Sequence, residues 1–249
     1  MPRRLGWIRS TPDHRDLMRA APMIDPSVLP PMVDLRALFP EPPFDQGDFG
    51  SCVFNAGAAL MQYQQRRQAF PVWMPSRLFW YKNVRRMEGT GNEDAGAQVR
   101  DAMKSLNTTG VCYEALWPYD DAHFGAEPPK ECYEVAENHQ AIRYARVRQY
   151  PDHIRAEIAQ GNPIIFGATL YRSFESDLVA ATGDVPYPGR LEEPIGGHCM
   201  LIVGYERDQV IVRNSWGIGW GDKGHCLMPM DYVCSTNLAD DLWVCTLLE

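Results

Sequence analysis

The chain has 249 residues, of which 45% are hydrophobic and 22% charged, a balance typical of a folded protein with a sizeable core. Its formal net charge of −8 at pH 7 argues against nucleic acids and anionic membrane surfaces as main partners, because both attract basic patches. No apolar run approaches the ~20 residues of a membrane span. The basic N-terminus has no apolar segment behind it and is not a conventional secretory signal, which leaves a cytoplasmic location or signal-independent export open.

Seven cysteines, an odd number, leave at least one thiol free if the others pair. No Cys-x-x-Cys occurs, so we expect no structural zinc site and no other bound metal. Cys112 and Cys132 are a possible disulfide, and the cysteines outside the motifs below are interpreted as buried thiols or bridges. We also expect no cofactor and a monomer.

Residues 1–30 are rich in Pro and Arg and show no sustained hydrophobic period. Such a segment is either a disordered leader or an extended strap that lies across the surface. Trp7 and Ile8 give it apolar groups to bury, which favours the strap. We call residues 1–30 the N-terminal strap.

Residues 31–140 are predicted to be mainly helical. The spacing of apolar residues predicts a helix from Cys52 to about Gln68. Ser76 is suited to capping a second helix, and a third is expected over 98–106. The prolines between 110 and 129 indicate an irregular stretch.

Residues 141–249 are predicted to be mainly β. Alternating or apolar runs predict strands over 141–150, 163–170, 199–205 and 210–213, the last two joined as a hairpin. Asp152 is expected to cap a short helix between the first two strands. The chain is thus predicted to be α+β, with a helical lobe beside a β lobe and a functional site between them.

The stretch Gln46-Gly47-Asp48-Phe49-Gly50-Ser51-Cys52 places a lone cysteine at the start of the first predicted helix. Unpaired backbone N–H groups and the positive end of the helix dipole favour a thiolate there. The amide of Gln46 could donate a hydrogen bond to a developing oxyanion. Taken alone, Cys52 is as consistent with a structural buried thiol as with a nucleophile.

Two further residues complete a possible catalytic set. Gly196-Gly197-His198 precedes the strand over 199–205, and its return strand leads into Asn214. His198 and Asn214 are therefore expected on neighbouring strand ends, with the imidazole facing open space. An Asn carbonyl that accepts from one imidazole nitrogen would fix the tautomer and leave the other nitrogen facing a thiol.

Gln-Gly-x-x-Gly-Ser-Cys, Gly-His before an apolar strand, and Asn-Ser-Trp-Gly-x-x-Trp-Gly together resemble the papain-like cysteine peptidases. His198 follows Cys52 by 146 residues (198 − 52), within the ~130–150 typical of that family. The resemblance covers about residues 31–235. It implies a papain-like two-lobe α+β fold, with a helical left lobe, a β-barrel-like right lobe and the active-site cleft between them.

The resemblance also implies roles for individual residues. Cys52 is the nucleophile, His198 the base and then the acid, and Asn214 the group that orients the imidazole. Gln46 and the Cys52 N–H form the oxyanion hole of a reaction through an acyl-enzyme. Peptide or protein substrates are bound with the help of three residues in the cleft: Gly96, Gly197 and Trp216, the last of which shields the His–Asn hydrogen bond.

The sequence departs from the family pattern at three points. Phe49 stands where the family usually has a disulfide cysteine, and Val53 replaces an aromatic residue after the nucleophile. Only about 30 residues precede the mature-like start, as in bacterial members whose short leader lies over part of the cleft. We hypothesise that the N-terminal strap restricts access in the same way.

A catalytically silent or ligase-like member that binds peptides is the alternative reading. The intact set of Cys52, His198, Asn214 and Gln46 argues against silence. The sequence leaves the pocket preference, and the choice between endopeptidase and exopeptidase, open.

Overall fold

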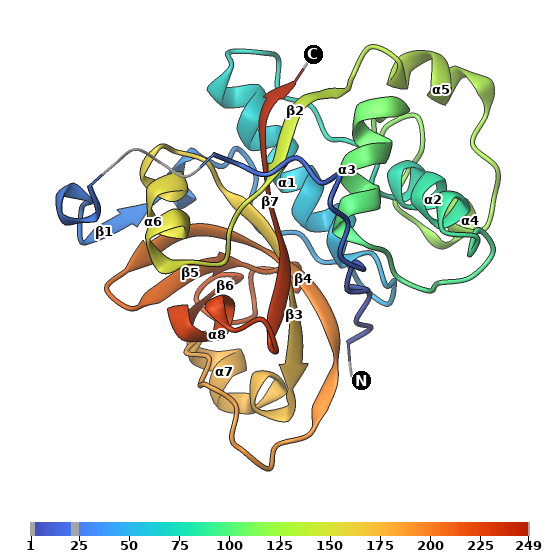
Figure 1. Cartoon of the computed structure of the whole chain (residues 1–249). Coiled ribbons are helices and arrows are strands. Elements are labelled where there is room, and N and C mark those ends of the chain that lie inside the picture. Colours follow the sequence, from blue (N-terminus) through green and yellow to red (C-terminus); the bar gives the residue numbers. More distant parts are fainter. Residues whose placement is uncertain (1–2, 21–24, 249) are drawn as a thin grey trace.

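The computed structural model describes residues 3–20 and 25–248; residues 1, 2, 21–24 and 249 lie outside the described part (Figure 1). The helices of the described part are α1 (Cys52–Arg67), α2 (Arg77–Met87), α3 (Val99–Thr108), α4 (Asp121–Phe124), α5 (Lys130–Ala136), α6 (Pro151–Ala159), α7 (Asp177–Thr182) and α8 (Met230–Cys234). Its strands are β1 (Met32–Asp34), β2 (Ala141–Arg146), β3 (Ile164–Tyr171), β4 (Pro194–Glu206), β5 (Gln209–Arg213), β6 (His225–Pro229) and β7 (Ala239–Leu248).

The strands form one antiparallel sheet in the order β2-β7-β3-β4-β5-β6, with β1 paired to β4. Helices α2, α3, α4 and α5 gather on one side of the molecule, the strands β3 to β6 gather on the other, and α1 lies between them (Figure 1). Helices thus predominate in the first half of the chain and strands in the second. The exact division at 30/31 and 140/141 stays a prediction.

Helix α1 is buried on nearly every side. Its first 14 residues, 52–65, are all buried, because it packs against β4 and β7 on one side and α2 and α3 on the other. Gly57 permits the close approach of α2, since a Cβ at this position would lie 2.7 Å from the Trp80 ring. The sequence pattern of one apolar face therefore understates how deeply this helix is enclosed.

The local predictions have mixed outcomes. Ser76 does cap α2, where its hydroxyl accepts from the Phe79 N–H. The prediction that Asp152 caps α6 was wrong, because Pro151 occupies the first helical position and Tyr150 is the cap residue. The predicted irregular stretch 110–129 contains a short helix, α4, which Asp120 caps through the His123 N–H. The strand predicted over 141–150 ends at Arg146.

The N-terminal strap is held at two separate places. Residues 3–10 pass through the cleft described below. Further along, the Arg19 N–H donates to the Arg146 carbonyl and the Arg146 N–H donates to the Leu17 carbonyl, each at 2.7 Å. The strap therefore continues the sheet beside β2. Asp16 reinforces this second attachment by accepting from Arg100 and from Arg146.

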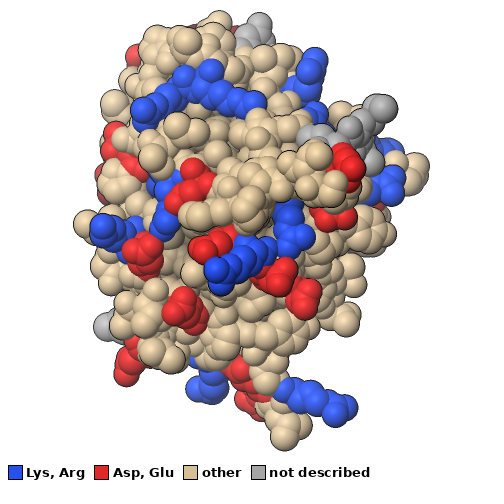
Figure 2. Space-filling model, turned by 90° about the vertical axis from the view of Figure 1, so that its left-hand side faces the viewer, with Lys and Arg blue, Asp and Glu red and all other residues tan. Residues whose placement is uncertain are grey.

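The surface carries both signs of charge. On the face shown in Figure 2, basic and acidic side chains are interspersed over a largely uncharged surface. In the described part of the chain, no helix is both long enough and apolar enough to cross a bilayer. The expectations of a monomer and of no nucleic-acid partner stay predictions.

Candidate active site

Three elements bring the predicted catalytic residues together. Cys52 is the first residue of α1, His198 lies within β4, and Asn214 directly follows β5, the neighbouring strand. The His198 Nε2 and Asn214 Oδ1 are 2.8 Å apart. The Cys199 N–H, next to His198, donates to the Cys52 Sγ at 3.4 Å. Residues separated by 146 positions thus share one site.

The prediction that His198 opens a strand and faces open space was wrong. Strand β4 begins at Pro194, so His198 is its fifth residue, and its side chain is completely buried. The second ring nitrogen, Nδ1, is buried and has no hydrogen-bond partner among the described residues. An imidazole held by Asn214 through Nε2 therefore keeps Nδ1 available for a proton.

The Ser215 hydroxyl fixes the orientation of the Gln46 side-chain amide. Its Oε1 accepts from the Ser215 hydroxyl at 2.6 Å, so the amide nitrogen must point the other way. Nε2 donates to the Phe49 carbonyl at 2.8 Å and to the Arg4 carbonyl of the strap at 3.0 Å. The Arg4 carbonyl thus accepts from the same amide nitrogen that the sequence analysis predicts to stabilise an oxyanion.

Aromatic side chains enclose the His198–Asn214 pair. The Trp216 ring lies 5.2 Å from the imidazole, centroid to centroid, and is itself nearly buried. Phe174 packs edge-on against Trp216 at 5.3 Å and stacks on Trp220. Excluding water lowers the local dielectric constant, which strengthens the hydrogen bond between His198 and Asn214.

Burial holds the thiol and the imidazole in their neutral forms. It raises the pKa of Cys52 to about 11, although the hydrogen bond from the Cys199 N–H and the nearby N–H groups of Gly6, Val53 and Cys52 favour the thiolate. Burial lowers the pKa of His198 to about 4, against the opposing effect of Asn214. With the strap over the site, desolvation therefore raises the pKa of Cys52 by more than the helix N-terminus, on which the sequence prediction relied, lowers it.

The strap is what covers the site. The Trp7 N–H donates to the Gly197 carbonyl at 2.9 Å, and the Gly6 N–H is close enough to Cys52 to favour its thiolate. On the opposite wall, the Ala97 N–H donates to the Gly6 carbonyl at 2.8 Å and its carbonyl accepts from the Ile8 N–H at 3.0 Å. The strap backbone is therefore hydrogen-bonded to both walls of the cleft.

Ala97, and not its neighbour Gly96, makes the backbone hydrogen bonds to the strap on this wall, and the substrate-binding role of Gly96 stays a prediction. The Gly96 N–H instead donates to the Tyr81 hydroxyl at 2.8 Å. Gly96 adopts a φ of +81°, and a Cβ there would lie 2.3 Å from the Gly6 carbonyl oxygen. Glycine is thus required here because the strap backbone comes so close.

Sequence reasoning missed the role of Asp94. This carboxylate accepts from the Gly50 N–H at 3.0 Å and from the Tyr81 hydroxyl at 2.6 Å, and it also pairs with Arg4 of the strap. It ties the loop before Cys52 to α2 and to the strap. The surrounding Gly- and acid-rich stretch carried no motif that could have singled it out.

The departures from the family pattern are explained by packing. The Phe49 ring stacks on Phe124 at 4.8 Å and packs edge-on against Tyr119, so aromatic contacts hold this loop where a disulfide is usual. Val53 is completely buried. The possible disulfide is not formed, since Cys112 and Cys132 are both free thiols.

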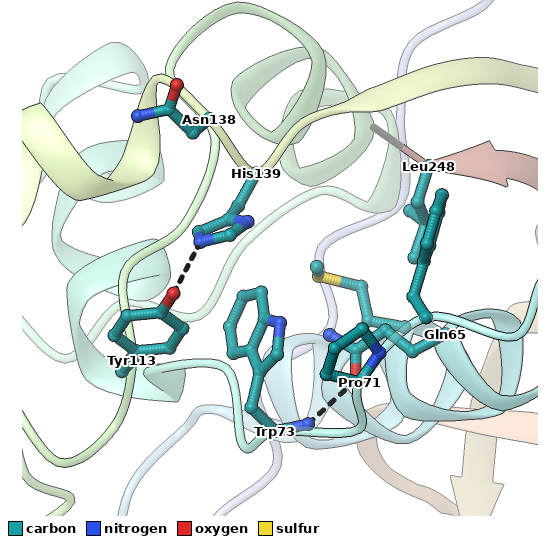
Figure 3. A pocket seen from close by; sticks show the side chains of 9 residues that line it. Gln65, Pro71, Trp73, Tyr113, Asn138, His139 and Leu248 are labelled. Carbon is teal, nitrogen blue, oxygen red and sulfur yellow. Dashed lines mark hydrogen bonds between the residues drawn. The ribbon is translucent and has the colours of Figure 1, made fainter.

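A separate cavity of about 230 Å³ lies near the C-terminal end of α1, away from Cys52 (Figure 3). Trp73, Tyr113 and His139 surround it, and the His139 Nε2 is 2.9 Å from the Tyr113 hydroxyl. No cysteine or serine is among the described residues that line it. Within residues 3–20 and 25–248, no cluster of three or more His, Cys, Asp or Glu side chains could hold a metal ion.

His225, another buried histidine, makes a testable contribution to stability. Burial, aided by the charges of Arg213 and Arg36, lowers its pKa to about 4. Between pH 6.5 and 4 the unfolded chain binds a proton that the folded chain does not. The stability that His225 contributes is therefore fully present above pH 6.5 and is lost as the pH falls, by about 3 kcal/mol over the whole window.

We expect His225→Gln to make the free energy of unfolding less dependent on pH than in the unchanged chain. Urea unfolding of both chains at pH 7 and pH 4.5 measures their free energies of unfolding. The pKa shifts of all other groups contribute equally to the two chains and cancel in the comparison. Equal losses of stability in the two chains would contradict the prediction.

The comparisons with known proteins agree with this geometry. The model of the papain family cysteine proteases matches residues 29–243. An uncharacterised peptidase C1-like protein of Acanthamoeba polyphaga mimivirus is 38% identical over 271 residues, covering 97% of this chain and 86% of that protein.

Among solved structures, xylellain, a cysteine protease from Xylella fastidiosa, is 37% identical with a TM-score of 0.91, covering 98% of this chain and 97% of its own. Digestive procathepsin L 3 of the Tenebrio molitor larval midgut is 18% identical, covers 94% of this chain and 75% of its own, and has a TM-score of 0.73, a likeness of fold alone. The predicted α+β, papain-like fold is confirmed. The chain belongs to the papain family of cysteine proteases and is a hydrolase.

Proposed function

We propose that this cysteine peptidase hydrolyses peptide bonds through Cys52, His198, Asn214 and Gln46. The Cys52 thiolate attacks the carbonyl carbon of the scissile bond, and the imidazolium of His198 then protonates the leaving amine. Gln46 and the Cys52 N–H stabilise the tetrahedral oxyanion. Water, deprotonated by His198, hydrolyses the acyl-enzyme and restores the thiol.

The hydrogen bond between His198 Nε2 and Asn214 Oδ1, at 2.8 Å, is the observation that carries this proposal. It leaves the other ring nitrogen, Nδ1, buried and without a partner among the described residues, while the Cys199 N–H, next to His198, donates to the Cys52 sulfur. Gln46 supports the same interpretation, because Ser215 fixes its amide so that the nitrogen donates to a carbonyl at the site.

We further propose that the strap inhibits the full chain. Its groups are placed unproductively: Gln46 holds the Arg4 carbonyl, whereas the strap N–H that favours the Cys52 thiolate belongs to Gly6, two residues away. Attack requires the sulfur to face the carbon of the carbonyl that Gln46 binds. The strap can therefore occupy the cleft without presenting a bond for cleavage, while it keeps the thiol buried and neutral.

Hydrolysis of fluorogenic dipeptides under reducing conditions, with and without an epoxide that reacts with activated thiolates, tests the proposal. Trp7→Ala is compared with the unchanged chain, since it removes the largest side chain that the strap places in the cleft. We expect turnover that the epoxide abolishes, and faster labelling in the variant.

Because the chain has seven cysteines, mass spectrometry must locate the epoxide. Attachment at Cys52 supports the peptidase. If neither chain cleaves a peptide and neither is labelled at Cys52, a catalytically silent, peptide-binding protein becomes the better description.

A further inference from the structure

One tyrosine hydroxyl connects the two segments that carry the proposed oxyanion donors. Tyr119 lies in the loop before α4, and its hydroxyl donates to the Gln46 backbone carbonyl at 2.8 Å. The same hydroxyl lies 2.5 Å from the Ser51 Oγ. Ser51 directly precedes Cys52, whose N–H is the second proposed donor. The hydroxyl therefore joins the loop of Gln46 to the start of α1.

The hydrogen bonds around this hydroxyl run in one direction. The Gln46 carbonyl can only accept, so it takes the single proton of the Tyr119 hydroxyl. The Ser51 hydroxyl then donates to the Tyr119 oxygen, and the Ser51 oxygen accepts from the Asn55 Nδ2 at 3.1 Å. Burial raises the pKa of Tyr119, so the hydroxyl keeps its proton. A directed chain of hydrogen bonds thus leads from Asn55 to the Gln46 carbonyl, and each bond polarises the next.

Arg77, the first residue of α2, holds this chain in place. Its guanidinium donates to the Asn55 Oδ1 at 2.8 Å, which fixes the amide so that Nδ2 faces Ser51. The guanidinium carbon also lies 3.8 Å from the centroid of the Tyr119 ring. Two nitrogens of the guanidinium donate to the Glu114 carboxylate, at 2.9 and 2.8 Å, and keep it in this orientation. Contacts of the ring therefore support the position of the hydroxyl.

Gln46 is held from the opposite side by Ser215. The Gln46 N–H donates to the Ser215 carbonyl at 2.9 Å, and its Oε1 accepts from the Ser215 hydroxyl. These bonds tie Gln46 to the segment after β5, but Cys52 belongs to α1. In the described part of the chain, Tyr119 has the only side chain that is hydrogen-bonded to both Gln46 and Ser51. It is therefore the side chain that links the two donors.

We propose that Tyr119 is a positioning residue for the oxyanion hole, whose hydroxyl holds the Gln46 amide and the Cys52 N–H at a fixed separation. The inference rests on the proposed function. Donors stabilise an oxyanion most when they are in place before the charge develops, because no reorganisation is then needed during the attack. If one donor loosens relative to the other, the transition state loses stabilisation that the bound substrate never had, so kcat falls and KM does not.

The first test removes only this hydroxyl. Tyr119→Phe is compared with Tyr63→Phe, because the Tyr63 hydroxyl also donates to one backbone carbonyl, that of Gly161 at 2.9 Å, but near the other end of α1. Both changes are made in the full-length Trp7→Ala chain, and kcat and KM are measured with a fluorogenic peptide. A strap that competes with substrate changes KM and leaves kcat unaffected, so kcat reports on the reaction of bound substrate.

We expect Tyr119→Phe to lower kcat about 10-fold with little change in KM, and Tyr63→Phe to leave kcat within about 2-fold. Combined with Gln46→Ala, Tyr119→Phe should cost less than about 3-fold, because no pair of donors is left to align. A merely structural contribution would lower kcat equally with and without Gln46. That result, or a kcat for Tyr119→Phe as high as that for Tyr63→Phe, overturns the inference while the peptidase stands.

The second test needs no turnover. The Cys52 sulfur bonds to the carbon of a peptide aldehyde as the C=O double bond becomes single, and the thiol proton passes to the oxygen. The resulting hemithioacetal places that oxygen at the proposed donors. Alkylation of Cys52 by iodoacetamide, located by mass spectrometry, is the reference, because the displacement of iodide develops no oxyanion.

We expect Tyr119→Phe to weaken binding of the aldehyde about 10-fold and to change the rate of alkylation by less than about 2-fold. Aldehyde binding as tight as in Tyr63→Phe, or equal effects on binding and alkylation, overturns the inference. If the Trp7→Ala chain neither cleaves a peptide nor binds the aldehyde, the proposed function fails, and the inference fails with it.

Discussion

A chain that begins at Thr11 is expected to hydrolyse peptides about 100-fold faster than the full chain, or more. Removing residues 1–10 removes Trp7, whose burial alone is worth roughly 2–3 kcal/mol, together with the hydrogen bonds of the strap backbone to both walls. Each 1.4 kcal/mol of stabilisation that the covered form loses raises the ratio of open to covered enzyme tenfold, until the open form predominates. Initial rates at low substrate concentration measure the effect.

The start at Thr11 is preferable to a start near residue 31. The attachment of residues 16–19 to β2 and to Arg100 then remains, so the edge of the sheet is not exposed. Leu17→Ala in the full chain is the matched control, because this side chain belongs to the strap but is exposed. Equal rates in the full and shortened chains would show that the strap does not inhibit.

Replacement of Cys52 by Ala is expected to lower kcat by at least about 10⁴-fold, in the full chain and in the shortened one, because no other group can form the acyl-enzyme. Loss of one buried sulfur should leave the fold intact, with a modest change in Tm. Circular dichroism and the rate of peptide hydrolysis measure the two effects.

Cys226→Ala is the matched control for this substitution. Cys226 is also a buried free thiol, but it lies in β6 and outside the site. It should lose stability to a similar extent and retain most of the hydrolysis. Turnover by Cys52→Ala at a rate near that of the unchanged chain would disprove the role of Cys52.

The motifs made much of the fold and of the site predictable from sequence. Local signals predict α1 and the Ser76 cap well, because helix periodicity and side-chain capping depend on neighbours in sequence. The family motifs select Cys52, His198, Asn214 and Gln46, and the structure brings these four side chains to one place. Their catalytic roles stay a proposal.

Other features were not predictable, because they depend on contacts between distant segments. Periodicity could not reveal that desolvation beneath the strap would outweigh the helix N-terminus at Cys52. Nor could it indicate Ala97 as the residue that pairs with the strap, or Asp241 as the acceptor for an indole 234 positions away in sequence. Such partners are set by strand register and by close backbone approach, for which a single sequence gives no local signal.

If the strap inhibits as proposed, its second attachment, at Leu17 and Arg19 beside β2, makes that inhibition an intramolecular competition. If residues 3–10 leave the cleft while this attachment holds, only residues 11–15 separate them from a fixed point, and their effective concentration at the cleft stays in the millimolar range. A substrate must outcompete that local concentration, so the enzyme responds to abundant or tightly bound peptides. On the same proposal, a single cut within residues 11–15 removes this tether and is expected to let residues 3–10 dissociate from the cleft.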